Sequence, residues 1–458
     1  MAGATAGAVG GLGAALPTWS ALPFAGILLS IALLPIAAPH FWRRHHPKVA
    51  LAWGVALAVP FVWIYRADAV QEILRVAIAE YLPFIVLLAA LYTIGGGVQV
   101  RGTLRGSPAV NTAILALGTV LASWVGTTGA AMLLVRPLLR ANAGRQHRAH
   151  TVVFFIALVA NVGGALTPLG DPPLFLGFLA GVPFFWTLSL AAETVTVAAL
   201  LLAIYFAVDR RYERQERRLA SSPPADVGRE PLTIEGAHNL LFLAGALAAV
   251  IVSGTWHAGE VSVLGVHQEL QNLLRDGFLL LMLAGSWWTT PRCIRAANGF
   301  SWEPVREVAI LFAAIFVTLI PALAILRAGD LGAMAPILRA VRTPAHCFWA
   351  AGLLSSLLDN APTYLAFLST ALGRFHPGLG DRQAIAALVA AHAHYLEAIS
   401  TGAVFMGANT YLGNAPNFMV RAIAEEMGVE MPSFFGYILR FTLPVLMPVF
   451  LLTAWIFF

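Results

Sequence analysis

Residues 161–175, NVGGALTPLGDPPLF, interrupt a long apolar region with groups that could bind an ion. The stretch contains a Gly-Gly pair, three prolines and one acid, Asp171. A transmembrane helix does not continue undisturbed through Gly-Gly, Thr-Pro and Asp-Pro-Pro within a few turns. Backbone that breaks at membrane depth must be buried in protein or line a cavity, and an acid there indicates function. We therefore interpret the stretch as a broken helix that builds a binding site.

A second copy of this stretch occurs near the end of the chain. GANTYLGNAPNF at 407–418 matches GALTPLGDPPLF at 164–175 in seven of twelve positions, and Asn414 takes the place of Asp171. Each copy follows an interrupted apolar segment, at 108–140 and at 346–372. When the middles of these segments are aligned, Gly126-Thr127 lies opposite Asp359-Asn360. The first half therefore contributes its acid, Asp171, from the break, and the second half contributes Asp359 from the hairpin. We interpret the two segments as hairpins that enter and leave the membrane on one face.

The predicted ion site combines the two acids with neutral oxygen ligands from the hairpin tips and breaks. A carboxylate near the midplane can bind Na⁺ or a proton in turn, and that mutual exclusion is sufficient for antiport. The alternative role for the Thr and Asn side chains is hydrogen bonding between helices. The predicted set is Asp171, Asp359, Asn360, Thr167, Asn161, Thr127, Thr128, Asn409, Thr410, Asn414 and Thr363, with Asp171 and Asp359 as the Na⁺ candidates.

Three further titratable residues are candidates for a proton relay. Glu397 and His394 lie in the segment before the second break. Glu193 is the only acid besides Asp171 between Arg105 and Asp209. Alternatively, Glu397 pairs with an arginine near the membrane surface.

The composition is that of an integral membrane protein. Hydrophobic residues make up 59% of the 458 residues and charged residues only 11%, against about 25% in soluble domains. The net charge is +5, but the arginines are scattered between apolar segments, which excludes a nucleic-acid binder. The two cysteines, Cys293 and Cys347, form neither a disulfide framework nor a metal motif, and no resident cofactor is expected.

The pattern predicts an all-α polytopic membrane protein of about ten to thirteen membrane segments, from the length of a crossing. We expect a flexible tail at 1–21 and a first half at 22–208, with crossings near 22–39, 50–65, 81–98 and 187–208. An arginine-rich cytoplasmic linker at 209–235 follows, and the second half occupies 236–458. Its crossings are predicted near 238–254, 277–290, 307–327 and 434–457.

The distribution of arginine makes the two halves inverted repeats, covering about 80–208 and 307–458. Placing the arginine-rich loops at 43–48, 101–105, 136–148 and 210–218 in the cytoplasm requires an external N-terminus. The first hairpin then enters from the cytoplasm and the second from outside. Paired broken segments in inverted repeats are a sequence signal for the midplane site of a transporter.

The two motifs resemble those of the ion-transporter superfamily. GGALTPLGDPP resembles the Gly-Gly-Ala-x-Thr-Pro-x-Gly-Asp motif of sodium/proton antiporters of the NhaD type, and Asp359-Asn360-Ala361-Pro362 resembles the Asp-Asn-x-Pro of their second hairpin. The superfamily also includes arsenite and dicarboxylate carriers and citrate transporters of the CitMHS type. The resemblance implies two inverted repeats, each with a re-entrant hairpin and a broken helix, a homodimer, and elevator-type alternating access.

The sequence departs from both nearest subgroups. The antiporters commonly carry acids in the first hairpin tip, where this chain has Val125-Gly126-Thr127-Thr128. The dicarboxylate carriers have Ser-Asn-Thr in both hairpins, which this chain lacks. The two acids that the motifs do contain, Asp171 and Asp359, favour sodium/proton antiport. A Na⁺- or H⁺-coupled symporter of citrate or another small carboxylate is the alternative, and an arginine at the site would favour it. An enzyme is not expected, because no nucleophile–base pair or metal cluster is recognisable. The expected location is the bacterial inner membrane, with the lipid bilayer and a small ion or carboxylate as partners.

Overall fold

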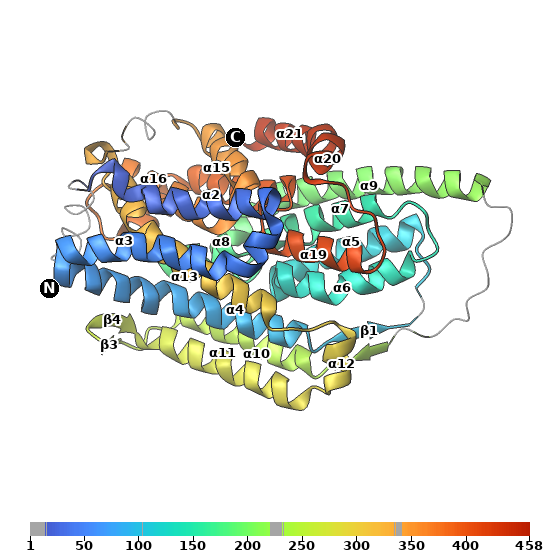
Figure 1. Cartoon of the computed structure of the whole chain (residues 1–458), viewed down its shortest axis with the longest axis horizontal. Helices are drawn as coiled ribbons and strands as arrows, with labels where there is room; N and C mark the ends of the chain where they lie inside the picture. The colour runs from blue at the N-terminus through green and yellow to red at the C-terminus, as the bar shows by residue number, and fades with distance from the viewer. Residues whose placement is uncertain are drawn as a thin grey trace.

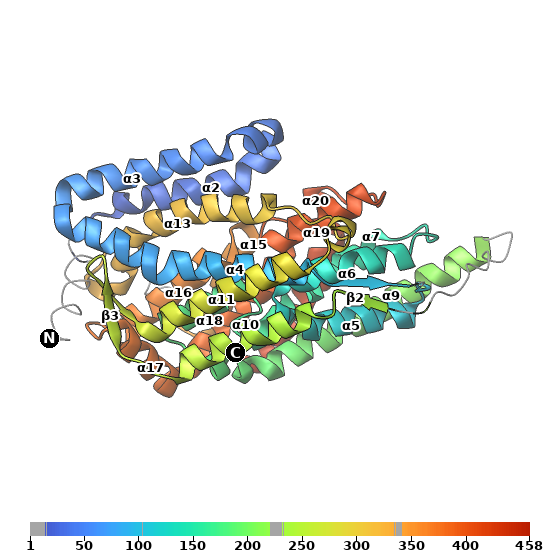
Figure 2. The ribbon, with the colours of Figure 1, turned by 90° about the horizontal axis from the view of Figure 1, so that it is seen from below.

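The chain forms an elongated bundle of helices in the computed structural model, which describes residues 14, 16–102, 104–219, 231, 233–333, 335 and 341–458. Most helices run roughly along the longest axis (Figures 1 and 2). Two short antiparallel strand pairs lie near opposite ends of that axis. The predicted all-α class is confirmed.

The N-terminal helices form a layer along one side of the bundle (Figure 2). Arg66, at φ 49°, interrupts the long helix α3, so the predicted crossings near 50–65 and 81–98 are joined by a kink and a π-helical segment. The predicted loop at 43–48 is wrong, because its basic residues lie inside α3. Of the predicted tail at 1–21, residues 1–13 and 15 lie outside the described residues. The elements are the 3-10 helix η1 (Thr18–Ala21), α2 (Leu22–Ala37), α3 (Pro39–Val76), η2 (Ala77–Tyr81) and α4 (Leu82–Gly95).

The first interrupted segment and the first broken helix follow as the sequence predicts. Two helices meet at Gly126, and their contact makes a hairpin. A short 3-10 helix and irregular backbone then separate two helices on either side of Asp171. The elements are α5 (Pro108–Val125), α6 (Thr127–Ala141), α7 (Ala149–Leu158), η3 (Val162–Leu166), α8 (Pro172–Ala180), η4 (Phe184–Leu190) and α9 (Ala191–Leu219).

The predicted linker at 209–235 begins too early. Helix α9 continues to Leu219, and Asp209 is fully buried by packing rather than solvated. Residues 220–230 lie outside the described residues. Strand β2 then pairs with β1, which precedes the first hairpin. The elements are β1 (Gln99–Arg101), β2 (Thr233–Glu235), α10 (Asn239–Thr255), β3 (Glu260–Val263), β4 (Val266–Glu269), α11 (Leu270–Thr289) and α12 (Arg292–Ala297).

The second half repeats the order of a crossing, a hairpin, a broken helix and a last crossing. The hairpin bends between Leu357 and Asn360, and the broken helix is interrupted around 407–414. The elements are α13 (Glu303–Arg327), η5 (Gly329–Leu331), α15 (Pro344–Leu357), α16 (Asn360–Phe375), α17 (Asp381–Ala391), α18 (Ala393–Met406), η6 (Gly407–Asn409), α19 (Ala415–Glu426), α20 (Phe434–Tyr437), the π-helical η7 (Ile438–Leu446) and α21 (Met447–Phe457).

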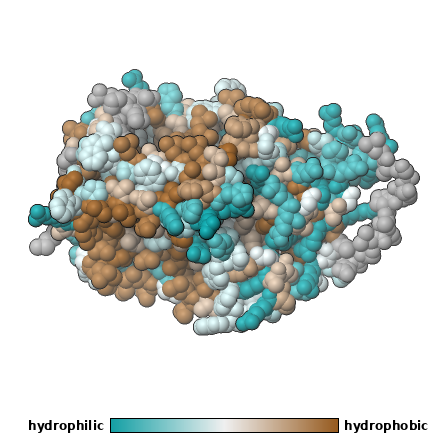
Figure 3. All heavy atoms as spheres, in the orientation of Figure 1, coloured by the Kyte–Doolittle hydropathy of each residue, from teal (hydrophilic) through white to brown (hydrophobic). Residues whose placement is uncertain are grey.

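Seven helical segments of the described chain are long and apolar enough to cross a membrane. The hairpin arms α6, α15 and α16 have only 15, 14 and 16 residues, which is short for a crossing of about 20. In Figure 3, hydrophobic residues cover much of the left and lower part of the visible face, and hydrophilic residues gather towards the right end. The chain is therefore an integral membrane protein. Its orientation and the exact number of crossings stay predictions.

Candidate functional site

The two hairpin tips differ in how the chain turns. In the first tip Gly126 adopts φ 79° and ψ 149°, and a residue with a Cβ would be strained there. The amide of Thr127 then donates to the carbonyl oxygen of Gly170 at 2.8 Å, which joins the tip to the first break. In the second tip the Asp359 carboxylate caps helix α16 by accepting from the amide of Ala361 at 3.1 Å.

Equivalent threonines attach each break to its hairpin. The hydroxyl of Thr167 donates to the carbonyl oxygen of Ser123, and that of Thr410 donates to the carbonyl oxygen of Ser356. Each hydroxyl also accepts from the amide two residues later. Since these residues align in the two copies, the match extends from sequence to hydrogen bonding. In this conformation Thr167 and Thr410 brace the backbone, and their predicted role as ion ligands stays a prediction.

Tight glycine packing makes the two breaks compact. A Cβ at Gly170 would collide with the carbonyl oxygen of Gly164, and one at Gly413 would collide with that of Gly407. These four glycines occupy aligned positions in the two copies. The glycines therefore allow the backbone to fold back on itself at both breaks, which exposes polar groups that a continuous helix would pair internally.

Asp171 lies where both halves meet, with 1% of its surface exposed. Its Oδ1 accepts from Thr127 Oγ1 at 3.1 Å and from Asn414 Nδ2 at 2.9 Å. Its Oδ2 accepts a short hydrogen bond from Asn360 Nδ2. The donors come from the first hairpin tip, the second break and the second hairpin tip. The structure thus brings three of the predicted site residues, Thr127, Asn360 and Asn414, to the carboxylate of a fourth, Asp171.

Asp359 is placed differently from Asp171. Its side chain is partly exposed and caps α16, while its neighbour Asn360 reaches Asp171. The two carboxylates interact electrostatically, but they do not share a hydrogen-bond donor among the described contacts. In this conformation Asp171 is central and Asp359 caps α16 beside it, and the predicted two-carboxylate site stays a prediction.

An asparagine cluster surrounds the far side of Asp171. Asn414 also donates to the carbonyl oxygen of Ala160 at 3.0 Å, and Asn161 donates to Asn417 Oδ1 at 2.7 Å. Asn417 in turn donates to two carbonyl oxygens of the second break. Sequence reasoning missed Asn417, because it aligns with an apolar residue, Leu174, in the first copy. The signal was the second asparagine in NAPNF.

The remaining predicted ligands lie around this centre without contacting Asp171 in the described hydrogen bonds. Thr363 donates to the carbonyl oxygen of Asp359 at 3.0 Å. Asn409 donates to Ser356 Oγ at 2.9 Å, and its buried Oδ1 has no partner within the described chain. Asn360 Oδ1 is buried and unpartnered in the same way. Buried amide oxygens without donors are costly unless a ligand or water reaches them.

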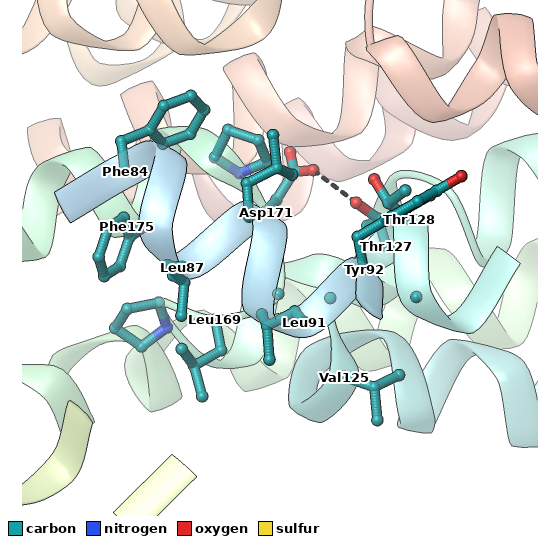
Figure 4. Close-up of a pocket in the computed structure, with 16 residues that line it drawn as sticks. Phe84, Leu87, Leu91, Tyr92, Val125, Thr127, Thr128, Leu169, Asp171 and Phe175 are labelled. Atoms are coloured by element: carbon teal, nitrogen blue, oxygen red, sulfur yellow. Dashed lines mark hydrogen bonds between the residues drawn. The ribbon is translucent and has the colours of Figure 1, made fainter. Parts of the chain in front are cut away.

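A cavity opens between Asp171 and helix α4 (Figure 4). The cavity is narrow and partly open to solvent. Asp171, Thr127 and Thr128 supply side-chain oxygens to its wall, and α4 contributes aromatic and leucine side chains that sequence reasoning did not assign to the site. The lining residues are Phe84, Leu87, Leu88, Leu91, Tyr92, Val125, Gly126, Thr127, Thr128, Gly129, Pro168, Leu169, Gly170, Asp171, Pro172 and Phe175.

Comparison with known protein families assigns this architecture. Residues 13–458 match the family described as "Putative citrate transport". The chain belongs to this family. The match covers both hairpins and both breaks, so it concerns the whole site and not a single motif. No curated protein matches the sequence.

None of the three relay candidates forms a hydrogen bond with Asp171 in the described structure. Glu193 is 5% exposed at the start of α9. Glu397, in α18, accepts from or donates to His394 Nδ1 at 2.9 Å, depending on protonation, and His394 is largely exposed. Glu193 lies close enough to Glu397 and His394 to interact with them electrostatically. The three predicted residues are therefore grouped, while their role in proton transfer stays a prediction.

A buried ionic network at the other end of α9 was not predicted. Asp209 Oδ1 lies 2.5 Å from Arg145 Nη1 and 2.9 Å from His150 Nε2. Its Oδ2 accepts from Asn111 at 3.0 Å and from Tyr205 at 3.2 Å. The network joins the first hairpin, the start of α7 and α9. In the sequence, this network is marked only by Asp209, which directly precedes the arginine cluster and falls within the predicted linker.

Proposed function

We propose that the protein is a cation-coupled secondary transporter of a small carboxylate such as citrate, with Asp171 binding the coupling ion. One observation carries this proposal. Asp171 is buried between the two halves, and three neutral side chains, with no basic one, donate to it in the described structure. The coupling ion is Na⁺ or a proton.

Neutral hydrogen-bond donors do not cancel the negative charge of a buried carboxylate. Hydrogen bonds to a carboxylate contribute about 1.5–3 kcal/mol each, whereas an unpaired buried charge costs several kcal/mol. A proton or Na⁺ at Asp171 removes the net charge. Because the hydrogen-bond donors belong to both halves, a cation that changes the charge of Asp171 also changes how strongly the halves attract each other. This is the physical basis of coupling in the proposal.

Two observations support a carboxylate as the transported substrate. The first is membership of a family described as concerned with citrate transport. The second is Arg275 in α11, whose guanidinium lies 5.8 Å from the ring centroid of Phe175. Phe175 lines the cavity, and Arg275 is 2% exposed with Nη2 unpartnered in the described chain. Arg275 Nε also donates to Asp276 at 2.8 Å, so the charge behind this wall of the cavity is largely compensated, and only Nη2 is left as a donor for an anion.

Sodium/proton antiport is the second candidate function. The observation that favours it is that Asp171 lines the cavity while its lining contains no arginine, lysine or histidine. In this alternative Na⁺ and protons compete for Asp171, and no organic substrate is needed. Asp359 and the unpartnered Asn360 Oδ1 would then support Na⁺ binding.

The paired breaks support alternating access, since either half can open the centre to one side of the membrane. We propose elevator-type motion, a homodimeric assembly and location in a bacterial inner membrane as parts of the same hypothesis. These parts rest on the resemblance to the ion-transporter superfamily.

The test uses purified protein in proteoliposomes with an internal pH dye. Uptake of labelled citrate, driven by an imposed Na⁺ or pH gradient, is expected for the wild type and should be lost in Asp171→Asn. This substitution keeps the shape of the side chain but removes the charge. Glu213→Gln on the exposed part of α9 is the control, because Glu213 lies away from the site and pairs with Arg217.

The same vesicles separate the two functions. Na⁺-dependent collapse of a preformed pH gradient without citrate uptake, again abolished by Asp171→Asn, would replace the first proposal by antiport. Activity of either kind that survives unchanged in Asp171→Asn would remove Asp171 from the coupling site in both.

A further inference from the structure

Helix α9 carries two buried acids that differ in how their charge is compensated. Asp209 has a salt bridge to Arg145 and further hydrogen bonds from His150, Asn111 and Tyr205. Its burial is explained by structure alone, because every oxygen has partners and one partner is a permanent cation. Glu193 lies 16 residues earlier, roughly 24 Å along the helix, in different surroundings.

Glu193 lacks such compensation within the described structure. One of its oxygens accepts from its own backbone amide, and Oε2 is buried without a partner. The segments packed against this part of the helix, α5, η3, η4 and α21, contain no titratable side chain. The only titratable residue of α7 is His150, which binds Asp209 at the other end.

The charged groups that act on Glu193 come from α18. They are Glu397 and His394. Glu397 is a second carboxylate, with a side chain 13% exposed, so it adds a negative charge and does not supply a compensating cation. His394 binds Glu397 at 2.9 Å and is 79% exposed. The three residues therefore form a sequence from a buried, unpaired carboxylate to the molecular surface.

We propose that Glu193 and Glu397 form a second protonation site, which holds one proton between them and exchanges it with the surface through His394. In each transfer His394 Nε2 takes a proton from water and Nδ1 releases one to Glu397, so the imidazole returns to neutrality in its other tautomer. The proton then passes between Glu397 and Glu193 through water, because no hydrogen bond joins the two carboxylates within the described structure. One proton on the pair removes the repulsion between the two negative charges.

The position of the pair connects it to the ion site at Asp171. Helix α18 leads from Glu397 directly into the second break, where Asn414 binds Asp171. On the other side, Thr187 of η4, just before Glu193, donates to the carbonyl oxygen of Leu166 in the first break at 3.0 Å. Both carboxylates thus lie on elements that contact a break. The role of the pair in coupling rests on the proposed function, whereas the protonation of the pair does not depend on that function.

The coupling role is tested by comparing net transport with exchange in proteoliposomes. Glu193→Gln should reduce citrate uptake driven by a pH gradient by about tenfold or more, the size expected when a step loses a proton donor. Exchange of external labelled citrate for internal citrate needs no net proton movement and should stay near the wild-type rate. Glu213→Gln, the same substitution on the same helix, should change neither.

The protonation itself is tested without any substrate by infrared spectroscopy of the purified protein at neutral pH. The wild type should show a carbonyl band of a protonated carboxyl group that is absent in Glu193→Gln and retained in Asp171→Asn. Absence of such a difference overturns the proposal, whatever the substrate is. If the band is present and the wild type carries no citrate, the proposed substrate fails and the protonation site stands. Equal loss of net uptake and exchange in a folded Glu193→Gln protein contradicts the coupling role.

Discussion

Thr127 is the donor to Asp171 that can be altered with the least disturbance of shape. Its hydroxyl lies 3.1 Å from Asp171 Oδ1, and its side chain is buried. Thr127→Val removes this hydrogen bond and leaves the volume nearly unchanged. A hydrogen bond to a charged group contributes about 1.5–3 kcal/mol, so we expect the affinity for the coupling ion to change by about 10- to 100-fold. Ion titration of transport in proteoliposomes measures this.

The direction of that change identifies the coupling ion. A hydrogen bond stabilises ionised Asp171, so its loss should favour a bound proton and strengthen apparent proton binding. If Thr127 instead contributes its oxygen to a Na⁺ site, Na⁺ affinity should fall. Thr127→Ser retains the hydroxyl and should behave like the wild type in both cases. An unchanged ion dependence in Thr127→Val would show that this hydrogen bond is not made in the working transporter.

At the residue scale, the sequence allowed prediction of the central acid but not of its environment. Asp171 was predictable because an acid beside Gly and Pro breaks in an apolar region has few structural explanations. The contact between Asp171 and Asn414 joins residues 243 positions apart, and no local pattern encodes it. The alignment of the copies places Asp359 opposite Gly126, so it gave no indication that Asp359 caps α16.

At the element scale, one exposed ion pair joins helix α17 to strand β4. The Arg382 guanidinium donates to Glu269, and this hydrogen bond lowers the pKa of the Glu269 carboxyl although partial burial acts in the opposite direction. A carboxylate whose pKa is lowered in the folded state stabilises the fold above its unfolded pKa. That contribution is lost as the pH falls through the folded value.

We therefore predict that Arg382→Gln lowers stability at neutral pH by no more than about 1 kcal/mol, because Arg382 is largely exposed. The difference from the wild type should disappear only as the pH falls below the lowered folded pKa of Glu269, where the carboxyl is protonated in both states. Thermal unfolding in detergent over a pH series measures this. A difference that persists at acid pH would mean that Arg382 acts through packing against Gly181 and not through its charge.

Element boundaries were predictable where glycine, proline or a helix-capping residue marks the end of an element. Glycine and proline predicted both breaks and the first hairpin tip, and Ser107 and Thr343 cap the first helix of each hairpin. The boundary at 209 was misplaced because the arginines suggested a solvated linker, although they follow helical periodicity and α9 continues through them. The kink at Arg66 has no Gly or Pro beside it, so only tertiary packing determines it.

At the scale of the whole molecule, the predicted inverted topology places several arginines outside, among them Arg374 and Arg382, although cytoplasmic loops usually carry the excess of arginine. The structure gives two of them specific partners. Arg374 donates to the carbonyl oxygen of Val341 and lies over Phe375, and Arg382 pairs with Glu269. Arginines that are used in tertiary contacts carry less information about orientation than free ones in short loops. The cluster at the end of α9 therefore remains the stronger topological signal.

If the arginine cluster at the end of α9 is cytoplasmic, the two ends of the long axis lie on opposite sides of the membrane (Figure 1). Single cysteines are introduced as Ser262→Cys in the exposed strand β3 and Arg217→Cys at the exposed end of α9, in a chain without Cys293 and Cys347. An impermeant maleimide should label Ser262→Cys in intact cells. It should label Arg217→Cys only after the membrane is opened, because helix α10 crosses between the linker and β3. Labelling of both positions from outside would contradict a cytoplasmic linker, and with it the inverted relation between the two halves from which the central site is built.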